Sequence, residues 1–277
     1  MTTELPKPSG LAADEIAMTS GSGSVPSLGD RSATPATYAF AHEKDVIRQL
    51  IVDRKLKAVC EVGGGREPLF TVDEVAELDL DYTVLDISAA ELALTSPHYT
   101  KVIGDICSLS SDDSRIGSYD LVFSRQLAEH VSSGEAMHRN IFQLLRPGGI
   151  AFHFFPTLFS PAFVANKLLP ERLAQWTLRI VLGGHHEKFP AKYSWCYGPS
   201  PRRMQKFTAL GYTVIEYRPF YGTAYLQFFP VARRLEQSFH GMAAKRRSRL
   251  FTSYAWLILL KPVMPHADWA ATTSGHH

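Results

Sequence analysis

The chain has 277 residues, of which 45% are hydrophobic and 20% are charged, so it is long enough to bury a sizeable core. Its 29 basic and 27 acidic residues give a formal net charge of +2, a balance that gives no reason to expect nucleic-acid binding. Cys60, Cys107 and Cys196 lie too far apart for a CxxC pair, so neither a zinc ribbon nor a disulfide framework is supported. No secretory signal and no membrane-spanning apolar run is visible, so we expect a globular cytoplasmic protein.

Composition divides the chain into a central domain and two terminal segments. Residues 1–36 are rich in Thr, Ser, Gly, Pro and Ala, and such a segment buries too little apolar surface to offset the entropy of ordering it. We therefore predict a disordered tail over residues 1–36 and a loose tail over residues 269–277. The domain is expected to span residues 37–268.

The middle of the chain alternates between helical and strand patterns. Apolar residues at helical spacing predict a helix over residues 38–53, and another over residues 126–145. Short apolar runs predict five strands, which we place at residues 57–62, 82–85, 100–103, 119–123 and 149–155. Near-continuous apolar strands that alternate with helices are typical of a parallel sheet with both faces covered. The expected fold is a doubly wound, Rossmann-like α/β fold.

The C-terminal third continues this alternation. A helical pattern over residues 160–182 is interrupted by Pro170, and a loop rich in glycine and aromatic residues follows over residues 183–199. A helix should begin at Ser200-Pro201 and end at Gly211. Strands over residues 212–217 and 252–260, with a mostly helical segment over residues 225–249 between them, bring the predicted sheet to seven strands. The spacing leaves open whether this last connection is a helical crossover or a long hairpin. Residues 157–199 are expected to form a cap inserted in the domain, and residues 220–249 a helical excursion.

A glycine-rich turn, Gly63-Gly64-Gly65, follows the first predicted strand. Glycines allow a ligand to approach the backbone closely, and the start of a helix would offer free N–H groups. The dinucleotide fingerprint needs a glycine at position 68, where this chain has Pro68, which disfavours a nicotinamide cofactor. Asp86 ends the second predicted strand, where a carboxylate either accepts the hydroxyls of a ribose or caps a helix over residues 88–93.

Three further motifs follow in order: Gly104-Asp105-Ile106, then YDLVFS over residues 119–124, then LLRPGG over residues 144–149. Together with the glycine turn and Asp86, they resemble the class I S-adenosylmethionine-dependent methyltransferases, of the type 11-like kind. The resemblance extends over roughly residues 40–156. It implies S-adenosyl-L-methionine as the cofactor and a small-molecule or glycan-type acceptor, with O-methylation favoured and no nucleic-acid partner.

The resemblance implies roles for residues along the cofactor. Glu61 anchors its methionine end, above a loop formed by Gly63, Gly64 and Gly65. Ser124 and Gln126 line the methionine side of the pocket.

The resemblance also implies a nucleoside side. Asp86 holds the ribose, and Ile87 borders the same part of the pocket. Asp105 accepts a hydrogen bond from the adenine amino group, and the backbone N–H of Ile106 meets a ring nitrogen.

The sequence departs from the family pattern at two places. Arg66 stands where the family usually has a small residue, and it either pairs with the cofactor carboxylate or is solvated. Glu129-His130-Val131 resembles the EHV stretch of ubiquinone-type O-methyltransferases, some of which hold a divalent metal there. The further glutamate of that pattern is Gln126 in this chain, so we predict no metal site.

Methylation of a hydroxyl requires that its proton be removed, and His130 is the candidate general base because it follows the fourth predicted strand. His153 lies among phenylalanines in the fifth predicted strand, which favours a hydrogen-bonded core histidine.

Two other classes of protein remain as alternatives. An NAD(P)-dependent oxidoreductase is disfavoured by Pro68 and because this chain has no Tyr-x-x-x-Lys pair after the fourth or fifth predicted strand. The other alternative is a non-catalytic cofactor-binding protein. The basic run over residues 245–249 either meets an anionic membrane surface or, more simply, forms a solvated helix face.

Overall fold

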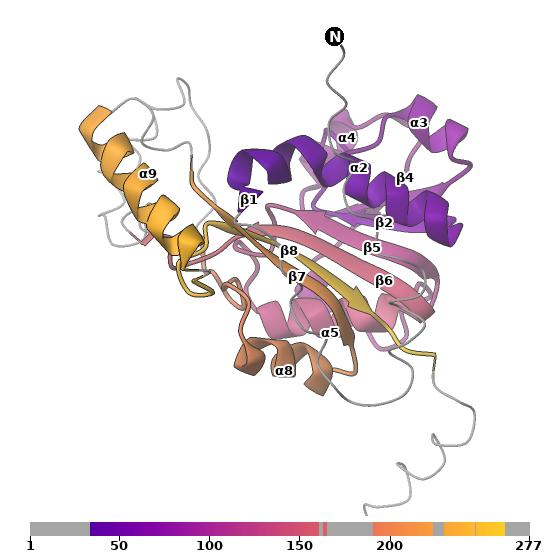
Figure 1. The fold of residues 1–277 in the computed structure, drawn as a ribbon. Helices are drawn as coiled ribbons and strands as arrows, with labels where there is room; N and C mark the ends of the chain where they lie inside the picture. Colours follow the sequence, from indigo (N-terminus) through magenta and orange to yellow (C-terminus); the bar gives the residue numbers. More distant parts are fainter. Residues whose placement is uncertain (1–33, 161–162, 165–190, 224–229, 247, 264–277) are drawn as a thin grey trace, which may run out of the picture.

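The structure is a computed structural model, and it describes residues 34–160, 163–164, 191–223, 230–246 and 248–263. Its centre is an eight-stranded mixed sheet with the strand order β1-β7-β8-β6-β5-β2-β3-β4. Helix α2 covers one face of this sheet, and helices α5 and α8 cover the other (Figure 1). The predicted α/β fold, mostly parallel with helices on both faces, is confirmed.

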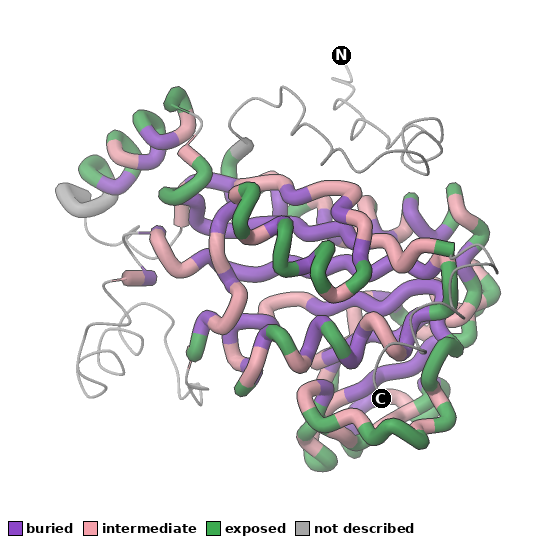
Figure 2. Tube along the Cα trace, turned by 90° about the horizontal axis from the view of Figure 1, so that it is seen from below, coloured by how far each residue is buried: buried purple, intermediate pink, exposed green. Residues whose placement is uncertain are grey.

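The parallel part of the sheet contains the five strands predicted in the middle of the chain. They are β2 (Ala58–Val62), β3 (Asp81–Asp86), β4 (Thr100–Ile103), β5 (Tyr119–Arg125) and β6 (Leu145–Pro156). Strand β2 lies between β3 and β5, and all the neighbouring pairs from β4 to β6 are parallel. The central strands are almost entirely buried, as the purple runs in Figure 2 show, which explains their continuous apolar sequences.

Helices connect these strands on the two faces. They are α2 (Ala36–Arg54), α3 (Val72–Glu77), α4 (Ala89–Leu94), a 3₁₀ turn η2 (Ile106–Ser108), α5 (Gly134–Leu144) and α8 (Pro201–Ala209). The prediction of a helix from residue 126 is wrong at its start, because residues 126–133 form turns and bends. The Ser133 side chain accepts a hydrogen bond from the Ala136 amide, so Ser133 is the N-cap and α5 begins at the next residue, Gly134.

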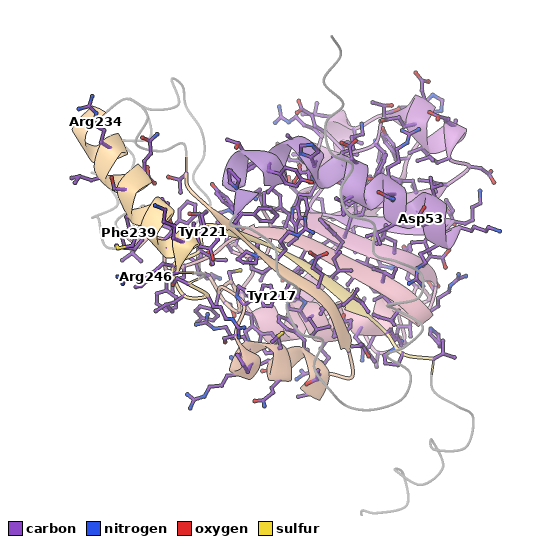
Figure 3. The ribbon with its side chains drawn as sticks, in the orientation of Figure 1. Asp53, Tyr217, Tyr221, Arg234, Phe239 and Arg246 are labelled. Atoms are coloured by element: carbon purple, nitrogen blue, oxygen red, sulfur yellow. The ribbon has the colours of Figure 1, made fainter. Side chains whose placement is uncertain are left out.

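Two C-terminal strands complete the sheet. Strands β7 (Thr213–Tyr221) and β8 (Tyr254–Leu260) pair antiparallel, and β8 also pairs antiparallel with β6. Their connection is therefore a long hairpin excursion that carries α9 (Pro230–Lys245), which resolves the alternative that spacing left open. Helix α9 contacts β7, and Figure 3 labels Tyr221 at the end of β7 and Phe239 on α9.

The described part begins with a two-residue strand, β1 (Thr34–Pro35), which pairs in parallel with Phe220–Tyr221. The predicted tail boundary at residue 36 is therefore too late, because Thr34, Pro35 and Ala36 belong to the fold. Residues 1–33, the tail over residues 269–277 and most of the predicted helix and cap over residues 160–190 lie outside the described residues. Residues 191–199 contain neither helix nor strand, as predicted. None of the helices described is long and apolar enough to cross a membrane.

Candidate functional site

The order in which the chain adds strands to the sheet reverses between β2 and β5. After β2 the chain continues to β3 and β4 on one side, whereas β6 lies on the other side of β5. In open α/β sheets, ligands bind outside the carboxyl ends of the strands at such a switch point. The loops after the two strands meet here, since a Cβ atom added at Gly63 would lie 2.9 Å from Leu127 Cδ1.

The glycine turn after β2 needs its glycines. Gly63 and Gly65 have φ values of 81° and 51°, in the left-handed region that favours glycine. A Cβ atom at Gly64 would lie 2.9 Å from Val84 Cγ1 and 3.1 Å from Glu61 Cδ, so the turn sits directly on β3 and on the Glu61 side chain. The three glycines therefore allow the backbone of the turn to pack closely against β3 and Glu61 at the switch point.

Asp86 joins the end of β3 to this turn. Its Oδ2 accepts a hydrogen bond from the Gly65 amide at 3.0 Å, and its Oδ1 accepts one from the Ser88 amide at 2.8 Å. The cap of α4 is Ser88, whose side chain accepts from the Glu91 amide, so the alternative that Asp86 caps this helix is wrong. A carboxylate has about four acceptor sites, which leaves Asp86 able to accept further hydrogen bonds from a ligand.

Glu61 lies beneath the glycine turn and is only 2% exposed. Its Oε2 accepts hydrogen bonds from the Tyr82 hydroxyl at 2.5 Å and from the Leu69 amide at 2.9 Å. Burial raises the pKa of this carboxyl, and those hydrogen bonds act against the shift. The structure thus places Glu61 as a support of the turn, and its contact with the methionine end of a cofactor stays a prediction.

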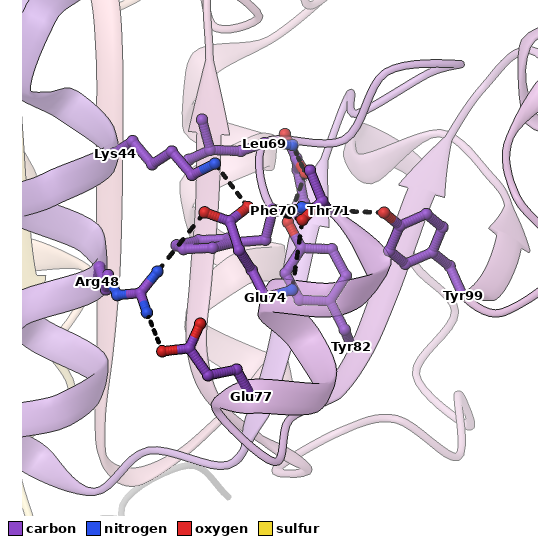
Figure 4. Close-up of polar contacts among 10 residues, drawn as sticks. Lys44, Arg48, Leu69, Phe70, Thr71, Glu74, Glu77, Tyr82 and Tyr99 are labelled. Carbon is purple, nitrogen blue, oxygen red and sulfur yellow. Dashed lines mark hydrogen bonds and ion pairs between the residues drawn. The ribbon is translucent and has the colours of Figure 1, made fainter.

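The segment after the turn is fixed by a second set of contacts, drawn in Figure 4. The Tyr99 hydroxyl donates to the Phe70 carbonyl at 2.9 Å, and Thr71 and Glu74 form a capping box at the start of α3. Lys44 on α2 reaches Glu74 at 2.6 Å. Both ends of the loop between β2 and α3 are therefore held in place.

The predicted nucleoside side lies at the ends of β3 and β4. The Gly104 amide donates to the Asp86 carbonyl at 2.9 Å, which brings the two strand ends together. Ile87 is 69% exposed beside Asp86, and Asp105 is exposed and accepts from the Cys107 amide at 2.8 Å. Ile106 is buried, and its carbonyl accepts from Asn140 Nδ2 at 2.7 Å. Asp86, Ile87 and Asp105 thus share one edge of the sheet.

The residues at the end of β5 and just after it divide between the interior and the switch point. The Ser124 hydroxyl is buried and lies 2.8 Å from His153 Nδ1, so it faces the core and does not support the predicted pocket-lining role. Gln126 has a left-handed φ of 48°, and its amide donates to the Phe154 carbonyl at 2.8 Å. Its buried Nε2 has no hydrogen-bond partner among the described residues. This donor is suited to a ligand that brings an acceptor.

His153 is a core histidine, as its sequence context predicted. It is fully buried and packs edge-to-face on His138, with 4.8 Å between ring centroids. Burial lowers the pKa of His138 to about 3, and burial with the neighbouring His138 holds the pKa of His153 well below its usual range. Both rings are therefore neutral near pH 7. The pairing joins α5 to β6, and no local pattern in the sequence indicates it.

Glu129 and His130 lie in the turn between β5 and α5, not on a helix as predicted. Their Oε1 and Nε2 atoms are 3.6 Å apart, with side-chain exposures of 6% for Glu129 and 35% for His130. Burial raises the pKa of Glu129 to about 8. The Glu129 carbonyl accepts from the amides of Lys192 and Tyr193 at 2.6 and 3.0 Å, so the loop over residues 191–199 holds this turn.

Arg66 pairs with Glu91 through two contacts, at 2.6 Å from Nε and 2.7 Å from Nη2. Both side chains are more than a third exposed, so the structure favours the solvated alternative for Arg66. Among the described residues, no group of three or more His, Cys, Asp or Glu side chains is arranged to hold a metal ion.

Comparison with known protein families gives a match over part of the chain. Residues 60–153, which run from β2 to β6 and contain the whole switch point, match the family described as "Methyltransferase domain". No curated protein matches the chain.

Solved structures with a similar fold include three that span most of the chain. They are the cyclase SpnF (16% identity, TM-score 0.49, covering 85% of this chain and 86% of that one), the CMeT domain of the citrinin polyketide synthase (16%, 0.49, 83% and 53%), and an S-adenosylmethionine-dependent methyltransferase from Mesorhizobium loti (16%, 0.43, 78% and 99%). At these identities and TM-scores, the neighbours carry no information on what the chain acts on.

Proposed function

We propose that this chain, a class I S-adenosylmethionine-dependent methyltransferase, methylates a hydroxyl group of a small-molecule or glycan-type acceptor. The main support for a cofactor site here is the contact between the glycine turn and Asp86, whose carboxylate accepts a 3.0 Å hydrogen bond from the Gly65 amide. This contact lies within the matched residues 60–153 and at the switch point of the sheet.

The residues at the switch point fit S-adenosylmethionine. The glycine turn leaves room for close approach, and Asp86 has acceptor sites left for ribose hydroxyls. The Nε2 of Gln126, which has no hydrogen-bond partner in the described part of the chain, is a donor suited to the cofactor carboxylate. Asp105 and Ile87 are exposed at the same edge of the sheet as Asp86, which supports a role for them beside the base.

When bound, S-adenosylmethionine supplies an electrophilic methyl group on a positively charged sulfur. The protein's task is then to hold the acceptor in line and to exclude competing water, which is catalysis by proximity. The fixed loop between β2 and α3 and the anchored turn over residues 126–133 provide this rigidity.

A hydroxyl acceptor must also lose its proton, and we assign this step to His130. Its side chain is 35% exposed, unlike the buried imidazoles of His138 and His153, so it can be reached by an acceptor. Burial raises the pKa of the adjacent Glu129 to about 8, so that carboxyl is mostly uncharged near pH 7. His130 Nε2 would take the proton as the methyl group arrives.

The test is methyl transfer from isotopically labelled S-adenosylmethionine to a panel of phenols, alcohols and glycosides, followed by the appearance of S-adenosylhomocysteine. We expect transfer to at least one hydroxyl acceptor and its loss in Asp86→Ala. Calorimetric binding of NADH instead of S-adenosylmethionine would favour an oxidoreductase. Binding of S-adenosylmethionine with no transfer to any acceptor would favour a non-catalytic binding protein.

A further inference from the structure

A cavity of about 340 Å³ lies between the end of β7 and helix α9. Its polar lining includes Thr223, Glu236, Gln237 and His240, and Pro35 of β1 closes one side. This volume lies at the lower end of the range of about 300–1,000 Å³ for small-molecule sites, the size of one sugar ring with its substituents.

Two of the polar side chains are buried at this cavity. Glu236 is 7% exposed and His240 is 5% exposed, although both are on a helix at the surface. They are four residues apart on α9, so they share one face, and Glu236 Oε1 lies 3.6 Å from His240 Nε2. The Thr223 hydroxyl, just beyond β7, donates a hydrogen bond to the same Oε1.

The imidazole of His240 has unused hydrogen-bonding capacity. Apart from the 3.6 Å contact of Nε2 with Glu236 Oε1, which is too long for a hydrogen bond, neither Nδ1 nor Nε2 has a partner among the described residues, although both atoms are buried. A buried polar group without a partner is destabilising, so each one in a folded protein calls for an explanation. Since His240 lines the cavity, the missing partner is best supplied by a ligand there.

The chemistry of the lining selects the ligand class. An imidazole ring always offers at least one N–H donor, and the oxygens of a carboxyl group offer acceptors. A hydroxyl group both donates and accepts, so neighbouring hydroxyls can satisfy His240 and Glu236 together. A simple cation would satisfy Glu236 but would leave the donor of His240 without a partner.

The cavity lies at the same edge of the sheet as the switch point. Strand β7 runs antiparallel to β8, which runs antiparallel to β6, so β7 ends where β6 and β5 end. Helix α9 lies beyond the end of β7 (Figure 1), and Figure 3 labels Tyr221 at that end. A ligand bound here therefore sits on the functional edge of the molecule.

We propose that this cavity binds a hydroxyl-rich small molecule of about the size of a monosaccharide, held by Thr223, Glu236 and His240. Its identification as the acceptor, or as one sugar unit of it, rests on the proposed methyl transfer. The binding itself does not, because none of its contacts involves the cofactor residues.

The experiment is saturation-transfer NMR on the full chain, without S-adenosylmethionine, using a panel of methyl glycosides and choline as a cationic probe. Gly241→Leu is the blocking variant: Gly241 lines the cavity, is exposed and has no atom within 4 Å of an added Cβ, so the fold should tolerate it. Ser238→Leu, at an exposed position of the same helix outside the lining, is the matched control. His240→Ala tests the polar contact directly.

We expect a glycoside to bind the parent and Ser238→Leu equally, and Gly241→Leu and His240→Ala at least tenfold more weakly. Binding of choline in preference to every glycoside, no glycoside binding to the parent, or unchanged binding to Gly241→Leu would each overturn the proposal. Glycoside binding without any methyl transfer would overturn the proposed function and leave this site standing.

Discussion

The carboxylate of Asp86 and the backbone amide of Gly65 are linked by a 3.0 Å hydrogen bond that ties the end of β3 to the turn after β2. The same carboxylate accepts from the Ser88 amide at 2.8 Å, so one side chain fixes two loops at the switch point. Asp86 therefore supports the glycine turn and keeps acceptor sites free, which we propose are used by a ribose.

Replacing Asp86 with Ala should weaken S-adenosylmethionine binding at least tenfold, or about 1.4 kcal/mol, because hydrogen bonds to a charged acceptor are lost. Calorimetric titration measures this affinity. Asp81→Ala, at the exposed start of the same strand, should bind as the parent does. An unchanged affinity in a folded Asp86→Ala variant would remove this residue from the site.

Gly64→Ala should disturb the turn, because the new Cβ would lie 2.9 Å from Val84 Cγ1 and 3.1 Å from Glu61 Cδ. We expect a loss of about 1–3 kcal/mol in the free energy of unfolding, as for other overpacked sites, together with weaker cofactor binding. Gly104→Ala is the control, since nothing lies within 4 Å of its added Cβ. Equal unfolding midpoints for the two variants in urea would show that the turn accommodates the added Cβ atom without loss of stability.

His130→Ala should lower turnover by roughly 10²–10⁴ and spare cofactor affinity, the range expected for a lost general base. His130→Gln should be equally slow, because Gln can form hydrogen bonds but cannot take the proton. The exposed His98→Ala is the control for a lost imidazole. If both His130 variants turn over at the parent rate, catalysis depends on proximity alone.

Glu129 should make stability fall with rising pH. Burial raises its pKa from 4.5 to about 8, so between these values the folded state keeps a proton that the unfolded state has lost. The free energy of unfolding contributed by this group then decreases with pH, by at most about 1.4 kcal/mol per pH unit. The stability of Glu129→Gln relative to the parent should therefore increase from pH 5 to pH 8 in urea unfolding.

A matched variant separates this effect from a general loss of charge. Glu135→Gln, which removes a carboxylate that is 51% exposed, is measured over the same pH range as the control for a lost charge. A difference between Glu129→Gln and the parent that stays constant with pH would mean that Glu129 is already ionised in the folded protein.

Three of the parallel strands, β2, β3 and β4, could be predicted because each is a short run that ends at, or just before, Gly or Asp. Strand β4 covers Thr100–Ile103, the predicted residues, and β3 ends at Asp86 as expected. Helix α3 was missed because it is short and has no buried residue, although the Thr71 and Glu74 capping box was a visible signal.

The site could be predicted only where its residues are adjacent in sequence to strand ends. The predicted helix over residues 126–145 began too early because Ala128 and Val131 continue the apolar spacing, whereas Gln126 adopts a left-handed φ of 48°. The inward turn of Ser124 depends on His153 in β6, and the cavity at His240 depends on Thr223 beyond β7. Such contacts between distant segments leave no local pattern.

The position of β8 also constrains the order in which the protein can assemble during synthesis. It is inserted between β6 and β7, with Ile150 pairing with Leu260 far along the chain. Strands β2 to β6 can associate once Pro156 has left the ribosome, but β6 then presents an unpaired edge with Phe152 and Phe154 until β8 emerges. Unpaired apolar edges favour intermolecular association, so slow or truncated translation before residue 254 should yield aggregates built on β6.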